Sequence, residues 1–191
     1  MMRVFRLLAE MWNFKREACA GLIRGNSSRF AARLRGRMFR TRCAIDTHVF
    51  ITDHRNFSAG EGSALYHGCY ILNAEGKFRL GNNSHLGAYC YVNVCYGNVS
   101  VGDDVAVGPG TRIIAYSNHY EAGRKVTDVR LTRDVVVGNN VFIGANCSIL
   151  PGAVIHDNVV VAAGSVVKGE LEGNAIHGGV PCKKLREGWY G

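Results

Sequence analysis

Proline, paired cysteines and long apolar runs are scarce or missing in this chain of 191 residues. It has 3 prolines, and no apolar run approaches the about 20 residues that a transmembrane helix needs. The N-terminal apolar stretch is too short for a signal peptide and lacks a small-residue cleavage site, so none is expected. The 7 cysteines include no Cys-x-x-Cys pair, which favours reduced cytosolic thiols over disulfides or a zinc site. The length suits a single domain.

Acidic residues are also scarce at one end of the chain. Residues 1–42 carry eleven basic and two acidic side chains, a net charge of +9, whereas the whole chain carries +8. The remainder is therefore close to neutral, at −1. Apolar residues in 1–20 recur at helical spacing, which predicts a basic amphipathic helix able to lie on an anionic membrane. The alternative is a helical cap on the end of the domain. The body has no basic face and no nucleic-acid motif, so no nucleic-acid partner is expected.

A six-residue rhythm dominates the second half of the chain. Aliphatic residues recur six apart at Val137, Ile143, Ile149, Ile155, Val161 and Val167, with mostly small residues four places later. The same spacing occurs at Leu80, Leu86 and Val92 and again at Val101, Val107 and Ile113. Three extra residues, around Tyr96–Asn98, separate these two groups.

This period predicts a parallel β-helix, an all-β solenoid in which each hexapeptide supplies one short strand and one turn. The aliphatic residue faces inward, and Gly and Asn serve the turns because they accept left-handed backbone angles. Each coil buries its apolar faces only against its neighbours, so the ends need caps. We expect a basic, partly helical extension over 1–44, the β-helix over 45–176 and a C-terminal tail over 177–191. The segment Arg55–Gly62 is expected to be a loop, and residues 46–79 to include the acceptor site.

Four motifs resemble those of the hexapeptide-repeat acyltransferases, most closely the branch that acetylates sugars and polysaccharides. They are Val141–Ala145, Ile149–Gly152, Val161–Lys168 and Gly179–Arg186. The resemblance covers about residues 45–187. It implies a left-handed parallel β-helix, homotrimers with active sites between subunits, and an acetyl-CoA donor without a metal.

The rhythm is interrupted between Ile113 and Val137 by a polar segment, about 115–133, that contains His119. Solenoids place such insertions at corners, so a protruding loop is expected. The resemblance implies that His119 is the general base. Imidazole suits this role because its ordinary pKa lies near neutral pH. The resemblance also assigns Asn93 to acceptor binding or oxyanion support. Glu121 and Asn118 are both candidates to orient the imidazole.

The resemblance places the pantetheine arm of CoA along Ala145, Ala163, Val167 and Lys168, where small residues leave room for it. Beyond Pro181, the cations Lys183, Lys184 and Arg186 suit the phosphates of CoA. His177 is close enough in sequence to border the cofactor. One of His48, His54 and His67 is a candidate acceptor residue.

We therefore expect an acetyl-CoA-dependent O-acetyltransferase that acts on a surface polysaccharide or its lipid-linked precursor, in the cytoplasm or at the inner face of the membrane. Three alternatives stay open. An amino sugar on a nucleotide would make it an N-acetyltransferase. A trimeric scaffold would lack catalysis. A γ-type carbonic anhydrase would need histidine at a position held by Ile114 or Arg124, which argues against it.

Overall fold

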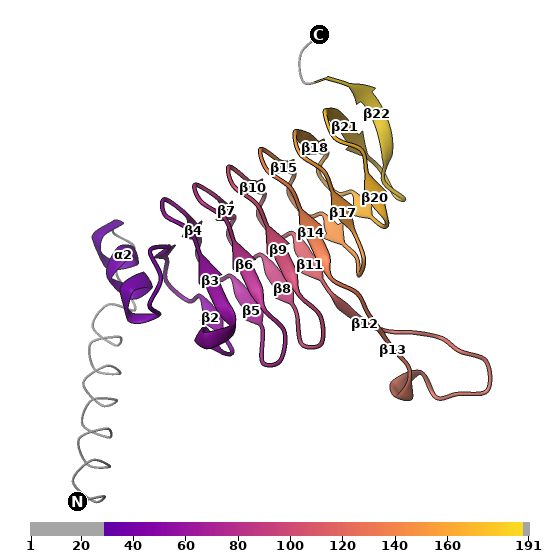
Figure 1. Ribbon diagram of the computed structural model, residues 1–191, viewed down its shortest axis with the longest axis horizontal. Coiled ribbons are helices and arrows are strands. Elements are labelled where there is room, and N and C mark those ends of the chain that lie inside the picture. The colour runs from indigo at the N-terminus through magenta and orange to yellow at the C-terminus, as the bar shows by residue number, and fades with distance from the viewer. Residues whose placement is uncertain (1–28, 189–191) are drawn as a thin grey trace, which may run out of the picture.

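Three parallel sheets form the sides of a triangular prism in the computed structural model, which describes residues 29–188 (Figure 1). Each coil contributes one strand to each sheet, so hydrogen-bonded parallel neighbours are three apart in strand order, or five apart where two further strands intervene in the fourth coil. The expected all-β fold, a left-handed parallel β-helix, is confirmed.

The first sheet contains β1 (Ala44–Ile45), β4 (Ala64–Leu65), β7 (His85–Leu86), β10 (Ala106–Val107), β15 (Phe142–Ile143), β18 (Val159–Val161), β21 (Ala175–Gly178) and the antiparallel β22 (Lys183–Glu187). The second contains β2 (Phe50–Ile51), β5 (Tyr70–Leu72), β8 (Tyr91–Asn93), β11 (Arg112–Ile114), β16 (Ser148–Ile149) and β19 (Val166–Val167). The third contains β3 (Phe57–Ala59), β6 (Phe78–Leu80), β9 (Val99–Val101), β14 (Val135–Val137), β17 (Val154–Ile155) and β20 (Glu170–Leu171).

The six-residue rhythm becomes the core of the prism. The aliphatic positions Leu86, Val107, Ile143 and Val161 stack in register along the first sheet, and each side chain is buried. Burial of these aliphatic columns is the main favourable contribution to stability, since each coil has only its neighbours to pack against.

The solenoid begins earlier than the rhythm alone indicates. Strand β3 pairs with β6, with Phe57 opposite Phe78, and both rings are buried. The expectation of a loop over Arg55–Gly62 is therefore wrong for Phe57–Ala59. The rhythm is hard to detect there because large aromatic residues replace the usual aliphatic ones.

The N-terminal end of the prism is covered by the helix α2 (Arg29–Met38). The buried Arg35 donates from Nε to the carbonyl of Ile45, at 2.6 Å, and so satisfies a strand that has no preceding coil. A side chain at Gly36 would collide with the carbonyl oxygen of Cys43, which explains the glycine at this close approach. The amphipathic helix expected over 1–20 lies outside the described residues.

Candidate active site

One corner of the prism, between the second and third sheets, carries the longest turns. Five-residue connections, 52–56, 73–77 and 94–98, occupy it in the first three coils. In the fourth coil the connection expands to residues 115–134, which contain the polar interruption. We call this edge the hairpin corner. The extra residues around Tyr96–Asn98 also lie here, so both irregularities of the sequence rhythm fall at one place.

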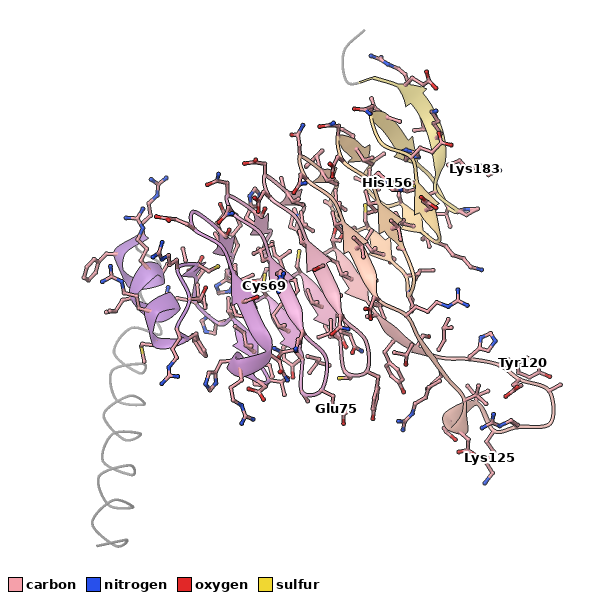
Figure 2. All side chains as sticks on the ribbon, viewed as in Figure 1. Cys69, Glu75, Tyr120, Lys125, His156 and Lys183 are labelled. Atoms are coloured by element: carbon pink, nitrogen blue, oxygen red, sulfur yellow. The ribbon has the colours of Figure 1, made fainter. Side chains whose placement is uncertain are left out.

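The insertion forms an antiparallel hairpin that projects from the prism. Strand β12 (Tyr116–Asn118) pairs with β13 (Arg130–Thr132), and a short 3₁₀ turn, η2 (Val126–Asp128), lies in the loop between them. Figure 2 shows Tyr120 and Lys125 well away from the coils, and Tyr120 is 73% exposed. The expected protruding loop is confirmed, whereas its strand pairing was not predicted.

Aromatic and guanidinium groups fix the base of the hairpin. The rings of Tyr96 and Tyr116 lie 4.9 Å apart, and the guanidinium of Arg130 sits 4.6 Å above the Tyr96 ring. The Arg133 side chain packs close to Gly152 of the next coil, and its amide donates to the carbonyl of Ala115 at 3.1 Å. The hairpin is therefore anchored to the coils on both sides of it.

Asn93 lies directly beneath the start of the hairpin. It is the last residue of β8, and its carbonyl accepts from the amide of Ala115 at 2.9 Å. Its side-chain nitrogen donates to the hydroxyl of Tyr91 at 3.3 Å, and its oxygen accepts from the amide of Cys95 at 3.2 Å. Burial raises the pKa of the Tyr91 hydroxyl. The side chain of Asn93 is thus held in a defined position at the hairpin corner.

His119 follows β12 and is exposed on the hairpin. Its amide donates to the carbonyl of Val129 at 3.0 Å, which fixes its backbone across the loop. Within residues 29–188, its imidazole makes no hydrogen bond, and it does not contact Asn93. Of the two candidates to orient it, Asn118 accepts from the Tyr116 hydroxyl and Glu121 pairs with Arg124 at 2.7 Å. Within residues 29–188, neither side chain makes a hydrogen bond or an ion pair with the His119 imidazole.

The other singled-out histidines lie elsewhere. His177 is buried in the position that aliphatic residues hold in earlier coils, opposite Val161, and its Nε2 lies 2.9 Å from the carbonyl oxygen of Glu172. His48 and His67 meet ring to edge, 4.9 Å apart, at the corner between the first and second sheets. His54 lies in the 3₁₀ turn η1 (His54–Asn56) at the hairpin corner.

The residues expected to line the pantetheine arm flank two strands of the second sheet, β16 and β19. Ala145 and Ala163 stack in successive coils at one end, where the amide of Gly164 donates to Ala145. Lys168 lies at the other end, on the hairpin corner, two coils beyond the hairpin. The side chain of Val167 is fully buried in the core, so this residue can meet a cofactor only through its main chain.

The C-terminal cations lie on β22 at the far end of the prism, where Figure 2 labels Lys183. Lys184 donates to Glu187 at 2.7 Å and to Glu172 at 3.0 Å, and these bonds raise the pKa of its ammonium group. Lys183 has no such carboxylate partner among residues 29–188. The Val180–Pro181 peptide bond is cis, and the following amide of Cys182 donates to Val166, so the segment returns to the second sheet.

Sequence reasoning missed the aromatic residues around Asn93. The rings of Phe50 and Tyr70 stack at 4.6 Å, and those of Tyr70 and Tyr91 at 6.2 Å, along the outer face of the second sheet. The available signal was the recurrence of aromatic residues 20 and 21 positions apart, one coil each. The six-residue period conceals it because the early coils are longer than three hexapeptides.

Residues 29–188 offer neither a metal centre nor a membrane-spanning helix. No group of three or more His, Cys, Asp or Glu side chains there could hold a metal ion, and no helix there is long and apolar enough to cross a bilayer.

The model of the family described as bacterial transferase hexapeptide (six repeats) matches residues 134–169. These residues form the regular coils that follow the hairpin. Over these residues the chain is similar to the hexapeptide-repeat transferases. The resemblance that the four motifs indicate is confirmed.

Relatives in this family differ in the acceptor named for them. The chain is 32% identical over 115 residues to a galactoside O-acetyltransferase of Escherichia coli, covering 58% of this chain and 57% of the relative. It is 27% identical over 160 residues to WbbJ of Escherichia coli, a putative lipopolysaccharide biosynthesis O-acetyl transferase, covering 79% of each. Thus the match spans little more than half of the first relative.

A solved structure shares the fold. AntD, an N-acyltransferase from Bacillus cereus in complex with dTDP and 3-hydroxybutyryl-CoA, superposes with a TM-score of 0.71 at 22% identity. The superposition covers 85% of this chain and 89% of that one.

Proposed function

We propose that this protein is an acetyltransferase that moves the acetyl group of acetyl-CoA to a sugar hydroxyl of a surface polysaccharide or its lipid-linked precursor. The observation that carries the proposal is His119 on a hairpin that projects from a hexapeptide-repeat prism. An exposed imidazole on an anchored hairpin is placed to serve a substrate rather than the core.

In the proposed reaction, His119 removes the proton of the acceptor hydroxyl as its oxygen attacks the thioester carbonyl. The new C–O bond creates a tetrahedral oxyanion, which needs a hydrogen-bond donor. The side-chain NH2 group of Asn93, which donates one hydrogen to the Tyr91 hydroxyl, would supply the donor with its second hydrogen. Collapse of the intermediate breaks the C–S bond, and the imidazolium returns the proton to the CoA sulfur.

The donor site is proposed on the coils that follow the hairpin. Ala145 and Ala163 leave space for a thin pantetheine arm along β16 and β19. Lys183, Lys184 and Arg186, beyond the cis bond to Pro181, would meet the CoA phosphates. The acyl-CoA bound to the structurally similar AntD supports this choice of donor.

We propose that the protein acts as a homotrimer, with each hairpin reaching a neighbouring copy. The exposure of Tyr120 and Val126 supports this, because large apolar side chains on a projecting loop gain burial from a partner surface. In that arrangement His119 of one copy serves the cofactor groove of the next. The basic extension, residues 1–42, would hold the trimer at the cytoplasmic face of an anionic membrane.

An N-acetyltransferase acting on a nucleotide-linked amino sugar is the second candidate. It is supported by the fold similarity to AntD, an N-acyltransferase with bound dTDP. The sequence relatives with O-acetyltransferase names favour the hydroxyl. The third candidate is a trimeric scaffold without catalytic activity.

The test is an assay of free CoA thiol with acetyl-CoA and three acceptor classes: hexoses, polysaccharide fragments and nucleotide-linked amino sugars. Release with a hydroxyl acceptor, lost in His119→Ala, is the expected result. Release with the amino sugar alone would make the protein an N-acetyltransferase. No release with any acceptor, together with no thermal stabilisation by CoA, would favour the scaffold.

A further inference from the structure

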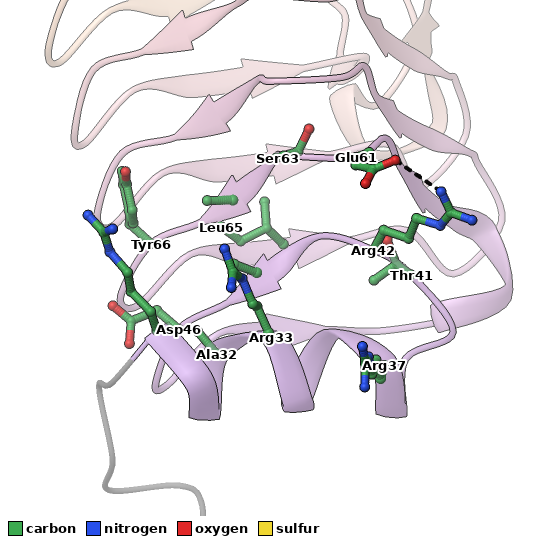
Figure 3. A pocket seen from close by; sticks show the side chains of 14 residues that line it. Ala32, Arg33, Arg37, Thr41, Arg42, Asp46, Glu61, Ser63, Leu65 and Tyr66 are labelled. Atoms are coloured by element: carbon green, nitrogen blue, oxygen red, sulfur yellow. Dashed lines mark hydrogen bonds and ion pairs between the residues drawn. The ribbon is translucent and has the colours of Figure 1, made fainter.

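A cavity of about 760 Å³ lies at the N-terminal end of the prism, between helix α2 and the first two coils (Figure 3). Such a volume lies within the roughly 300–1,000 Å³ of ordinary small-molecule sites. The helix forms one wall, and the strands β1 and β4 form the other. The cavity is therefore on the first sheet, remote in the fold from the hairpin corner, and no step of acetyl transfer uses it.

The helix presents a row of arginines to this cavity. Arg29, Arg33 and Arg37 recur every four residues, so they share one face and follow each other at about 6 Å along the axis. All three are exposed and line the cavity. Neither Arg33 nor Arg37 has a hydrogen bond or ion pair within residues 29–188, and Figure 3 shows the Arg33 side chain directed from the helix toward Leu65.

The acidic side chains of the cavity are already engaged. Glu61 accepts from Arg42 at 3.0 Å, and Asp46 lies 3.7 Å from Arg35, which is buried behind it. The three arginines of the helix face are therefore not neutralised by the cavity wall. Guanidinium groups in a row, with both carboxylates occupied, form a concave surface of net positive charge that attracts anions.

The opposite wall is apolar and aromatic. Ala64 and Tyr66 line it with their side chains, whereas Leu65, whose side chain is fully buried in the core, lines it only with its main chain. Tyr66 is 45% exposed, and its ring lies 5.4 Å from the His85 ring. An inorganic anion would leave this wall uncovered. A ligand with an anionic head and an organic part matches both walls.

We propose that this cavity, here called the arginine pocket, binds the diphosphate group of an organic phosphate. Each guanidinium can hold one phosphoryl group through two parallel N–H donors, and neighbouring arginines of the row are spaced for two linked phosphoryl groups. The organic part lies against Tyr66 and Ala64. The site goes beyond acetyl transfer and does not depend on it.

The first experiment measures binding of inorganic pyrophosphate to the whole chain by calorimetry and thermal shift. The double variant Arg33→Gln with Arg37→Gln should bind about tenfold or more weakly, because two charge-assisted contacts are lost. The matched control is Lys77→Gln with Arg79→Gln, two exposed cations of β6 and the turn before it. It removes the same charge elsewhere and should leave affinity within twofold. Equal weakening in both double variants would overturn the proposal, because it would show a general charge effect.

The second control concerns the C-terminal cations, which are proposed to meet the phosphates of CoA and so also attract pyrophosphate. The variant Lys183→Gln with Arg186→Gln should still bind pyrophosphate in the arginine pocket. The Arg33→Gln, Arg37→Gln variant should lack this binding. If the C-terminal variant removes all binding and the arginine-pocket variant removes none, the proposal is wrong. That outcome would leave the acetyltransferase proposal untouched.

Two further probes identify the source of the diphosphate group. One is a soluble nucleoside diphosphate, and the other is vesicles of phosphatidylcholine with or without a long-chain prenyl diphosphate. Binding of either probe that falls in the Arg33→Gln, Arg37→Gln variant supports the site and assigns its ligand as soluble or as a lipid headgroup. If both probes bind this variant as well as they bind the unaltered protein, the proposal is overturned.

Discussion

At the scale of single residues, the two side chains proposed for the chemistry belong to the same corner of the prism without a hydrogen bond between them. Asn93 is held in place by Tyr91 and by the amide of Cys95, whereas the His119 imidazole is exposed and makes no such contact within residues 29–188. A side chain without an internal role costs little to replace. Loss of activity on substitution of His119 would therefore reflect chemistry rather than folding.

His119→Ala should reduce kcat/KM with a hydroxyl acceptor by about 10²–10⁴-fold, the usual contribution of a general base. The unfolding midpoint should stay within a degree or so, since the ring has no partner within the described chain. Release of CoA thiol and thermal unfolding measure the two effects. His156→Ala is the matched control, because that imidazole is also exposed but lies on the third sheet beside Glu170. An unchanged rate in His119→Ala would remove the proposed base.

The buried thiols give a pH-dependent prediction. Burial raises the pKa of Cys43 to about 12, so its thiol stays protonated and unreactive well above neutral pH. We expect iodoacetamide at pH 8 to modify Cys43 in the unfolded chain but not in the folded one. Cys95, half-buried at the hairpin corner, serves as the internal comparison. Peptide mass spectrometry measures both, and rapid modification of Cys43 in the folded protein would contradict its place in the core.

Elements differ in how they are held, and the hairpin depends most on a few side-chain contacts. Its strands pair only with each other, and its base is fixed by Tyr96, Tyr116 and Arg130. The coils, in contrast, are hydrogen-bonded on both sides. Weakening the base should therefore affect the position of His119 more than the stability of the prism.

Arg130→Met should lower kcat by up to about tenfold, because a cation–π contact contributes about 0.5–2 kcal/mol to holding the hairpin. Tm should change little, since the prism does not rest on this contact. Arg124→Met is the control: it removes an arginine of the same loop that pairs with Glu121 rather than with the prism. Equal loss of kcat in both variants would show that charge on the loop, and not its anchoring, matters.

The sequence rhythm predicted the elements well where aliphatic residues hold the inward positions. Val137 to Val167 fell into strands as expected, and the interruption after Ile113 became the projecting loop. It failed at Phe57, where a large ring fills the inward position. Pairing within the hairpin could not be predicted, because β12 and β13 lack the alternation of apolar and polar residues.

The candidate site was predictable only as separate residues. The resemblance assigned Asn93 and His119 one at a time. Their common corner is a finding of the structure, in which the carbonyl of Asn93 accepts from the amide of Ala115 at the start of the hairpin. The aromatic support from Tyr96 and Tyr116 depends on side-chain directions that a period of six does not give. The arginine pocket was missed for a similar reason: its cations lie on a helix and its aromatic wall on the second coil.

At the scale of the whole molecule, the proposed trimer would divide the active site between copies. The hairpin that carries His119 projects away from the prism of its own chain (Figure 1), whereas Ala163 belongs to the coils that follow the hairpin. A trimer with shared sites predicts complementation between two inactive variants.

His119→Ala and Ala163→Trp should each be inactive alone, the first lacking the base and the second with its cofactor groove blocked. When the two are unfolded together and refolded, about a quarter of interfaces pair an intact histidine with an intact groove if mixing is random. Activity should return to about that fraction of the unaltered protein's rate. Two separately refolded samples, mixed afterwards, are the control. No recovery would place both groups of a site on the same chain.

The two ends of the prism have a consequence for self-association. A stack of parallel strands exposes unpaired backbone at its first and last coil, and such edges can recruit further chains. Here α2 covers one end, and β22 reverses direction along β21 at the other while displaying Lys183, Lys184 and Arg186 to solvent. Added coils from another molecule would meet a helix at one end and, on the first sheet at the other end, a charged antiparallel strand, so both features oppose end-to-end polymerisation into fibrils.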